Sequence, residues 1–302
     1  MSRKKVAIQG ARGSFHELAG MKHFGQDIQC TECLTFKNVF DCVINGQTDF
    51  GVTAIENTVA GTILPNYAML RESGVKIIGE VYLHIQQNLL ALKGQSIEDI
   101  REVHSHPMAI LQCQVFFEEF PHIKLIEADD TASRARWISE NKLKGMAAIA
   151  GLHVAGMYGL QVIAEGIETH KKNFTRFFVI QKGQDLQDQN SKSLSSLPTF
   201  QPSNLPDKAS LCFNVKHEKG SLAKVLTQLA EHEINLTKIQ SLPLVGKEWE
   251  YYIHIDMEFE SYNDYRNALS AIKPSLKEFI ILGEYKKGVK EEAPAAHLQK
   301  LN

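Results

Sequence analysis

The run "NFTRFFVI", residues 173–180, decides how the first half of this 302-residue chain is interpreted. Its last four residues, Phe177 to Ile180, are all apolar, which is typical of a buried strand. A threonine and an arginine, Thr175 and Arg176, stand directly ahead of them. Side chains alternate between the two faces of a strand, so either the strand is irregular here or only one of these polar residues faces a given ligand.

The composition is that of an ordinary globular protein, with 43% hydrophobic and 23% charged residues. A net charge of −2 does not indicate nucleic-acid binding, and no stretch approaches the roughly 20 apolar residues of a membrane span. The start "MSRKKVAIQG" runs directly into a strand-like segment and lacks the long apolar region of a signal peptide. The five cysteines, an odd number, fit reduced thiols, and we therefore expect a cytoplasmic location.

Strand and helix patterns alternate along residues 1–182, which predicts an α/β domain with mostly parallel sheets. Residues 183–207 are rich in Ser, Gln, Asn and Pro without periodicity, and are interpreted as a linker. Residues 208–287 then follow the order strand, helix, strand, strand, helix, strand, which is the ferredoxin-like βαββαβ unit. Residues 288–302 are expected to form a flexible tail.

Polar residues gather at four places in the first domain where a predicted strand ends. They are Arg12 and Ser14 in "QGARGS", Glu56 and Asn57 in "IENTVAGT", Ser105 and Gln112 in "HSHPMAILQ", and Thr131 in "DDTAS". Such corners offer free N–H groups and the positive ends of helix dipoles. Together with Arg176 they predict a site for a small carboxylate or phosphate. Taken singly, the three hydroxyl residues are more economically explained as helix caps.

Six sequence elements, taken in order, resemble the prephenate dehydratases that carry a C-terminal ACT domain. They are "GARGSFHELAG" (10–20), "AIENTVAG" (54–61), "SHPMAILQC" (105–113), "DTASRA" (130–135), "AAIAG…A…YGL" (147–160) and "NFTRFFVI" (173–180), the last with the family's Thr-Arg-Phe signature. The likeness spans about residues 4–287. One such element is weak evidence, whereas six in the right order identify the resemblance.

The resemblance implies a carbon-oxygen lyase that converts prephenate to phenylpyruvate with loss of water and carbon dioxide, in phenylalanine biosynthesis. It implies a catalytic domain over residues 1–182 that is similar to type II periplasmic binding proteins, with a cleft between two α/β lobes. Lobe 1 is expected at about residues 1–80 and 157–182, and lobe 2 at about 81–156. The family works without a metal or organic cofactor, so none is expected.

The resemblance also implies roles for the polar corners. Thr175 is expected closest to the leaving hydroxyl, where it donates a hydrogen bond or relays a proton. Three amide or hydroxyl residues match positions implicated in substrate binding or catalysis: Asn57, Ser105 and Gln112. The remaining candidates are assigned to substrate binding: Arg176, Glu56, Arg12, Ser14, Thr131 and Phe177. Arg176 suits a carboxylate because its guanidinium binds in bidentate fashion, unless strand alternation turns it toward a neighbouring strand.

The second domain resembles ACT modules, which sense amino acids and pair through their sheets. "HEKGSLAKVL" (217–226) matches the Gly-Ala-Leu element with Ser221 in place of alanine, and "QSLP" (240–243) stands where Glu-Ser-Arg-Pro is usual. Feedback by phenylalanine is therefore expected at Gly220, Ser221, Leu222, Gln240, Ser241, Leu242 and Pro243. The alternative is a purely structural dimerisation module, since an exposed sheet edge pairs readily with its copy. A homodimer or homotetramer is expected.

Two other functions stay open from the sequence. A small-anion solute-binding protein shares the cleft fold, but the predicted ACT domain and the missing signal peptide favour an enzyme. Arogenate dehydratase performs the same chemistry on the aminated substrate, and a single contact to an amino rather than a keto group would separate the two.

Overall fold

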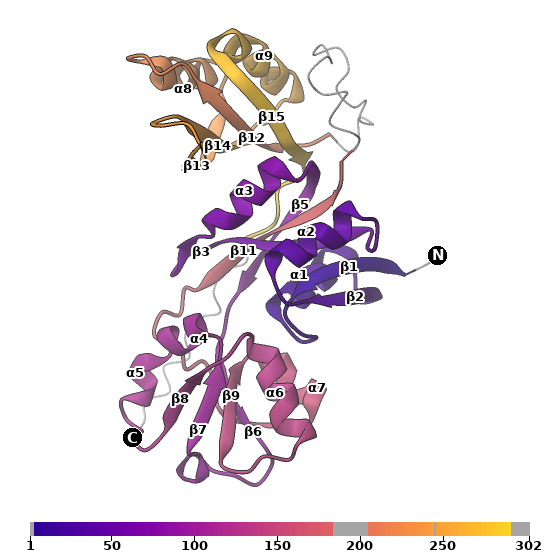
Figure 1. Cartoon of the computed structure of the whole chain (residues 1–302), viewed down its shortest axis with the longest axis vertical. Helices are drawn as coiled ribbons and strands as arrows, with labels where there is room; N and C mark the ends of the chain where they lie inside the picture. The colour runs from indigo at the N-terminus through magenta and orange to yellow at the C-terminus, as the bar shows by residue number, and fades with distance from the viewer. Residues whose placement is uncertain (1–2, 184–204, 245, 291–302) are drawn as a thin grey trace.

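A computed structural model of the chain describes residues 3–183, 205–244 and 246–290, so most of the predicted linker and tail lies outside the described residues. These residues form two sheets (Figure 1). The larger has the order β13-β14-β12-β15-β5-β11-β3-β1-β2 with β4 beside β3, and the smaller has the order β10-β6-β9-β7-β8. No helix in the described ranges is long and apolar enough to cross a membrane.

The first lobe supplies one end of the larger sheet and three covering helices. Its strands are β1 (Lys4–Gln9), β2 (Ile28–Cys33), β3 (Phe50–Asn57), β4 (Gly61–Thr62), β5 (Val75–His84) and β11 (Phe174–Lys182), and its helices are α1 (Phe15–Phe24), α2 (Phe36–Ile44) and α3 (Leu64–Glu72). β1 runs parallel to β2 and β3, whereas β11 enters antiparallel between β3 and β5. The expectation of mostly parallel sheets is therefore wrong here: the chain returns from the second lobe and inserts β11 in the opposite direction.

The second lobe is built on the five-stranded sheet. Its strands are β6 (Asn88–Ala91), β7 (Glu102–Ser105), β8 (Lys124–Glu127), β9 (Met146–Ala150) and β10 (Gln161–Ala164), and its helices are η1 (Ile97–Asp99), α4 (Pro107–Gln112), α5 (Gln114–Phe117), α6 (Thr131–Glu140) and α7 (Leu152–Tyr158). β10 pairs with β6, although we expected residues 157–182 in lobe 1. The reason is packing, because Leu160 and Val162 join the apolar cluster beneath α6 and α7.

The C-terminal unit has the predicted βαββαβ order. It consists of β12 (Lys208–Val215), α8 (Ser221–Glu231), β13 (Asn235–Pro243), β14 (Tyr251–Glu258), α9 (Tyr262–Ile272), η5 (Lys273–Ser275) and β15 (Leu276–Tyr285). Its strands are antiparallel to one another in the order β13-β14-β12-β15. Both long helices cover one face of this sheet, which leaves the other face to meet the first lobe (Figure 1).

The other face of this sheet packs against the first lobe. β15 pairs in parallel with β5 at Gly283 and Ile77, which makes the larger sheet continuous. Gly283 is required there, because a Cβ atom would overlap the carbonyl oxygen of Ile77. Cys212 and Leu282 share an apolar cluster with Tyr67 of α3. The C-terminal unit therefore forms part of the same buried core as the strands of lobe 1.

A histidine lies buried in this junction. His254 of β14 is 1% exposed, and its Nε2 atom lies 3.4 Å from the Sγ atom of Cys212. The ring of Tyr67 packs edge-on against it at 5.2 Å. Burial and the positive charge of Arg71 lower the pKa of His254 from 6.5 to about 4. The negative charge of Asp256 acts in the opposite direction but is the smallest of the three effects.

We predict that this histidine weakens the fold in mild acid. The unfolded chain binds a proton on His254 below about pH 6.5, whereas the folded chain does so only near its lowered pKa, so stability falls as pH falls between these values. One such histidine costs about 1 kcal/mol between pH 7 and 5.5. Urea unfolding of His254→Leu should show a shallower pH dependence than the wild type. The exposed His217→Leu variant should not, and equal slopes for all three proteins would contradict the prediction.

Candidate active site

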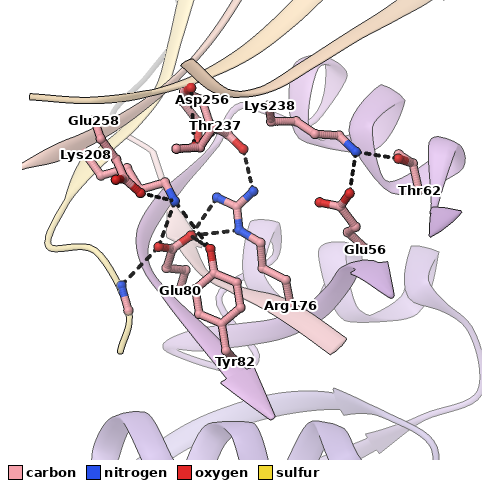
Figure 2. Close-up of polar contacts among 12 residues, drawn as sticks. Glu56, Thr62, Glu80, Tyr82, Arg176, Lys208, Thr237, Lys238, Asp256 and Glu258 are labelled. Carbon is pink, nitrogen blue, oxygen red and sulfur yellow. Dashed lines mark hydrogen bonds and ion pairs between the residues drawn. The ribbon is translucent and has the colours of Figure 1, made fainter. Parts of the chain in front are cut away.

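The ends of β3 and β11 present two neighbouring cross-strand pairs. Thr175 pairs with Asn57, and Arg176 pairs with Glu56. Their side chains alternate between the two faces of the sheet, as the strand pattern predicts. The first pair faces the polar contacts described below, and the second faces the C-terminal unit (Figure 2). A β-bulge follows at once, since the register on β3 shifts between Arg176 and Phe177.

The Asn57–Thr175 pair is held in one arrangement by the loop after β3. The Oδ1 atom of Asn57 accepts hydrogen bonds from the backbone N–H groups of Val59 and Ala60, at 2.9 and 2.7 Å. Its Nδ2 atom therefore points to Thr175 and donates to the hydroxyl oxygen at 2.9 Å. No described residue accepts the proton of that hydroxyl, and the residues Thr175 and Asn57 are each 8% exposed. The Thr175 hydroxyl can therefore still donate one hydrogen bond.

A buried residue that the sequence did not indicate extends this arrangement. Asn173 is fully buried, and its Oδ1 atom accepts from Asn57 at 2.7 Å. Its Nδ2 atom donates to the Oε1 atom of Gln112 at 3.0 Å, and Gln87 donates to the same oxygen at 3.3 Å. A chain of side-chain amides therefore joins Gln112 of the second lobe to Thr175 of the first. Asn173 opens the "NFTRFFVI" run, and its polar character ahead of a buried strand was the available signal.

Ser105 does not join this chain. Its hydroxyl donates to the carbonyl oxygen of Ile149 at 2.8 Å, and the residue is fully buried. The expected capping role is also wrong, because His106 is the N-cap of α4 and accepts from the N–H of Met108 at 3.2 Å. The Ser105 side chain therefore ties β7 to β9.

The loop before α1 reaches the second lobe. Ser14 is the N-cap of α1, as expected, and it is buried. Its neighbour Arg12 places its Nε atom 3.2 Å from Glu17, and 62% of its side chain is exposed. The hydroxyl of Tyr158 donates to the Arg12 carbonyl at 2.6 Å. The loop before α1 therefore contacts α7 of the second lobe through this hydrogen bond, and the Arg12 side chain pairs with Glu17 at the protein surface.

Thr131 is placed differently from the expectation. It is the first residue of α6, and Asp130 before it is the N-cap, with its carboxylate accepting from the N–H of Ser133 at 2.8 Å. The same carboxylate accepts from the N–H of Ala11 at 3.2 Å, across the two lobes. A negative charge therefore already occupies this helix start, so α6 does not offer an open anion site.

The assignment of Arg176 to substrate binding is wrong. Its Nε atom lies 2.7 Å from the Oε2 atom of Glu80, and its terminal nitrogens contact Asp256 and, at 3.3 Å, the hydroxyl of Tyr285. Although burial alone lowers its pKa, the surrounding negative groups, Asp256 foremost, raise the pKa of the Arg176 guanidinium well above its usual value. All three of its nitrogens contact protein groups on the face away from Thr175.

The assignments of Glu56 and Phe177 to substrate binding are also wrong. Glu56 accepts from the Nζ atom of Lys238 at 2.7 Å, on the side of the C-terminal unit. Phe177 is 1% exposed and packs edge-on against the ring of His16 at 5.1 Å, within the core of lobe 1. Both residues lie beside the site and support it, but neither side chain faces it. Within the described ranges, no group of three or more His, Cys, Asp or Glu side chains is arranged to hold a metal ion.

The fold and these polar ends define a two-lobed α/β protein whose candidate site lies where its two sheets meet. A family model described as "PDT: Prephenate dehydratase" matches residues 6–185, which is more than half of the chain. The chain belongs to the prephenate dehydratase family.

The chain is similar to named relatives and solved structures over nearly its whole length. The chain is 35% identical over 290 residues to the bifunctional chorismate mutase/prephenate dehydratase of Aquifex aeolicus, covering 95% of this chain and 75% of that protein. It is 34% identical to arogenate dehydratase 2 of Petunia hybrida, covering 94% and 72%. Prephenate dehydratase from Arthrobacter aurescens in complex with L-Phe superposes with a TM-score of 0.78 at 25% identity, covering 93% and 89%. A protein described as a quorum-quenching acylase, GqqA, superposes with a TM-score of 0.79 at 27% identity, covering 94% and 98%.

We predict that removing the bridging amide destabilises the site. Asn173→Ala removes two buried hydrogen bonds, one to the Oε1 atom of Gln112 and one from the Nδ2 atom of Asn57, which should lower the free energy of unfolding by about 1–3 kcal/mol. Urea unfolding measures this. Asn141→Ala, which removes an exposed amide that donates to the Trp137 carbonyl, should change stability by less than about 0.5 kcal/mol. Equal losses in the two variants would show that the bridge contributes nothing.

Proposed function

We propose that the protein is a prephenate dehydratase, a carbon-oxygen lyase that converts prephenate to phenylpyruvate, water and carbon dioxide in phenylalanine biosynthesis. The family match and the Aquifex relative support the activity. The observation that carries the assignment of the site is the Asn57–Thr175 pair, with its free hydroxyl proton at the junction of the two lobes. Family membership favours this enzyme over a small-anion solute-binding protein.

Aromatisation of the ring drives the reaction, so the protein must mainly help hydroxide leave. As the ring carboxylate departs as carbon dioxide, the electron pair of its carbon–carbon bond enters the ring and the carbon–oxygen bond to the hydroxyl breaks. The Thr175 hydroxyl donates its hydrogen bond to that leaving oxygen, which departs with the bonding pair and takes one proton from solvent, directly or relayed through this hydroxyl, to become water. Asn57 donates into the Thr175 oxygen, and a hydroxyl that accepts a hydrogen bond becomes a better donor.

The size of this contribution is bounded by the chemistry of threonine. A positioned general acid contributes about 10²–10⁴-fold, but an isolated hydroxyl is a poor acid. Thr175 therefore acts as a donor or as a relay, and orientation of the substrate supplies a comparable share. Gln112, linked through Asn173, contributes from the second lobe and couples the position of that lobe to Thr175.

Arogenate is the alternative substrate, because the Petunia relative is an arogenate dehydratase of nearly equal identity. The two substrates differ in one keto or amino group, so turnover on both decides between them. A higher kcat/KM on prephenate supports the proposal, and a higher kcat/KM on arogenate replaces it with the alternative.

We further propose that the βαββαβ unit is an ACT module that senses phenylalanine. The Arthrobacter relative was solved with L-Phe, and the unit has the expected strand and helix order. The predicted contacts are Gly220 to Leu222 at the start of α8 and Gln240 to Pro243 at the end of β13. β13 is a sheet edge, and Ile239 on it is 49% exposed, which supports pairing with a second copy in a homodimer or homotetramer. We place this enzyme in the cytoplasm.

We predict that Thr175→Ala folds and loses most of its turnover. Asn57 keeps its bond to Asn173, so the local structure has a remaining partner. The rate of phenylpyruvate formation, followed by its absorbance in alkali, should fall by about 10²-fold or more. Thr175→Ser keeps the hydroxyl and should stay within about tenfold of the wild type. An alanine variant with wild-type activity would remove Thr175 from the mechanism.

We predict that phenylalanine binds and inhibits the enzyme. Calorimetric titration of the full chain should show binding heat, and the dehydration rate should fall over the same concentration range. The sequence "QSLP" lacks the glutamate and arginine that are usual in this element, so affinity is expected to be weaker than in relatives that have them. If titration with phenylalanine gives neither heat nor inhibition, the sensor role is contradicted and this unit is a structural dimerisation module.

A further inference from the structure

The C-terminal unit contacts the residues directly beside the candidate catalytic pair. Glu56 and Arg176 are the next cross-strand pair after Asn57 and Thr175, and both turn to the C-terminal unit (Figure 2). β13 contacts the first of them and β14 contacts the second. Two strands of the C-terminal unit thus contact the pair next to the site, one on β3 and one on β11.

The contact from β14 is fully buried. Asp256 pairs with the guanidinium of Arg176, and its other oxygen accepts from Ser210 at 2.5 Å. Lys208 of β12 pairs with Glu80 at 3.0 Å, so the carboxylate on the far side of Arg176 is also held by the C-terminal unit. Arg176 is 5% exposed and Lys208 is 1% exposed. Charges removed from water in this way are tightly constrained by their partners.

The contact from β13 is simpler and more accessible. The Nζ atom of Lys238 lies 2.7 Å from Glu56 and 2.5 Å from the hydroxyl of Thr62, which is the β4 partner of Glu56. The Lys238 side chain is 11% exposed. Lys238 stands two residues before Gln240, in the strand that ends with the predicted effector element. A displacement of β13 would therefore pull on Glu56.

The bulge explains why these contacts matter for the site. Beyond Arg176 the register on β3 shifts, so an irregularity separates the end of β3 from the part of that strand that lies in the apolar core. Phe177 on the core side is buried in the apolar cluster of lobe 1, whereas Phe178 is buried in the cluster that lobe 1 shares with Cys212 and Tyr285 of the C-terminal unit. On the other side of the bulge, β11 stays paired with β5, and the side-chain contacts of the C-terminal unit add to the hold on Glu56 and Arg176.

We propose that Glu56 and Arg176 are positioning residues, through which the C-terminal unit sets the geometry of Asn57 and Thr175. The reaction they serve is that of the proposed function, on which this inference rests. Because neighbouring residues of one strand share a peptide unit, rotation at Glu56 moves Asn57, and rotation at Arg176 moves Thr175. The charge contacts of β13 and β14 are thus a path from the βαββαβ unit to the catalytic pair.

Lys238→Met in the full-length protein tests this, since the lysine makes one ion pair at the edge of the interface and the chain keeps its buried contacts. The kcat should fall about three- to tenfold with KM changed by less than about twofold, as expected when a catalytic group is displaced and binding is not. Exchange of the Val59 and Ala60 amides, which donate to Asn57, should speed up by a similar factor. The conservative Lys238→Arg variant should restore both.

The matched control is Lys277→Met. Lys277 pairs with Glu250 at 3.6 Å inside the C-terminal unit, so its loss should change neither kcat nor amide exchange. In a double-mutant cycle, Glu56→Gln with Lys238→Met should cost no more than either change alone, because both remove one contact. Additive losses, or a Lys238→Met protein with wild-type kcat and exchange, overturn the proposal. If the proposed function fails, the wild type does not convert prephenate. The effect of Lys238→Met on exchange of the Val59 and Ala60 amides would still test the positioning role on its own.

Discussion

The buried charge cluster around Arg176 is the interaction on which the arrangement of the chain depends. Its guanidinium lies between Glu80 of β5 and Asp256 of β14, and Lys208 stands on the far side of Glu80. Removing one member of such a cluster leaves an uncompensated charge in the interior, at a cost of about 3–5 kcal/mol. The first lobe and the C-terminal unit therefore cannot separate without exposing or unpairing these groups. The sheet that runs through both parts also keeps them together.

This constraint connects the two halves of the enzyme through one strand. β11 carries Thr175 on one face and Arg176 on the other, so chemistry and domain contact occupy adjacent positions. The amide chain through Asn173 adds the second lobe to the same point. Three parts of the molecule therefore converge on the first residues of β11, and a change in any of them reaches the Thr175 hydroxyl over short, directional contacts.

Much of the fold was predictable, because it follows from local patterns. The alternation of strand and helix, the Ser14 cap and the βαββαβ order are properties of consecutive residues, and the structure confirms them. β10 was assigned to the wrong lobe and β11 to a mostly parallel sheet, because strand partners are chosen by long-range packing. The predicted helix caps at Ser105 and Thr131 are also wrong, because His106 and Asp130 are the N-caps of these helices.

The sequence by itself determined the family, the presence of Thr175 beside Arg176, and the fact that a regular strand turns them to opposite faces, since these follow from residue order and the two-residue period of a strand. The tertiary structure decided which face belonged to which neighbour. Arg176 and Glu56 meet the C-terminal unit because β13 and β14, more than 50 residues further along the chain, bring Lys238 and Asp256 to that side. No local pattern encodes that approach, because it depends on how the C-terminal unit packs against the first lobe.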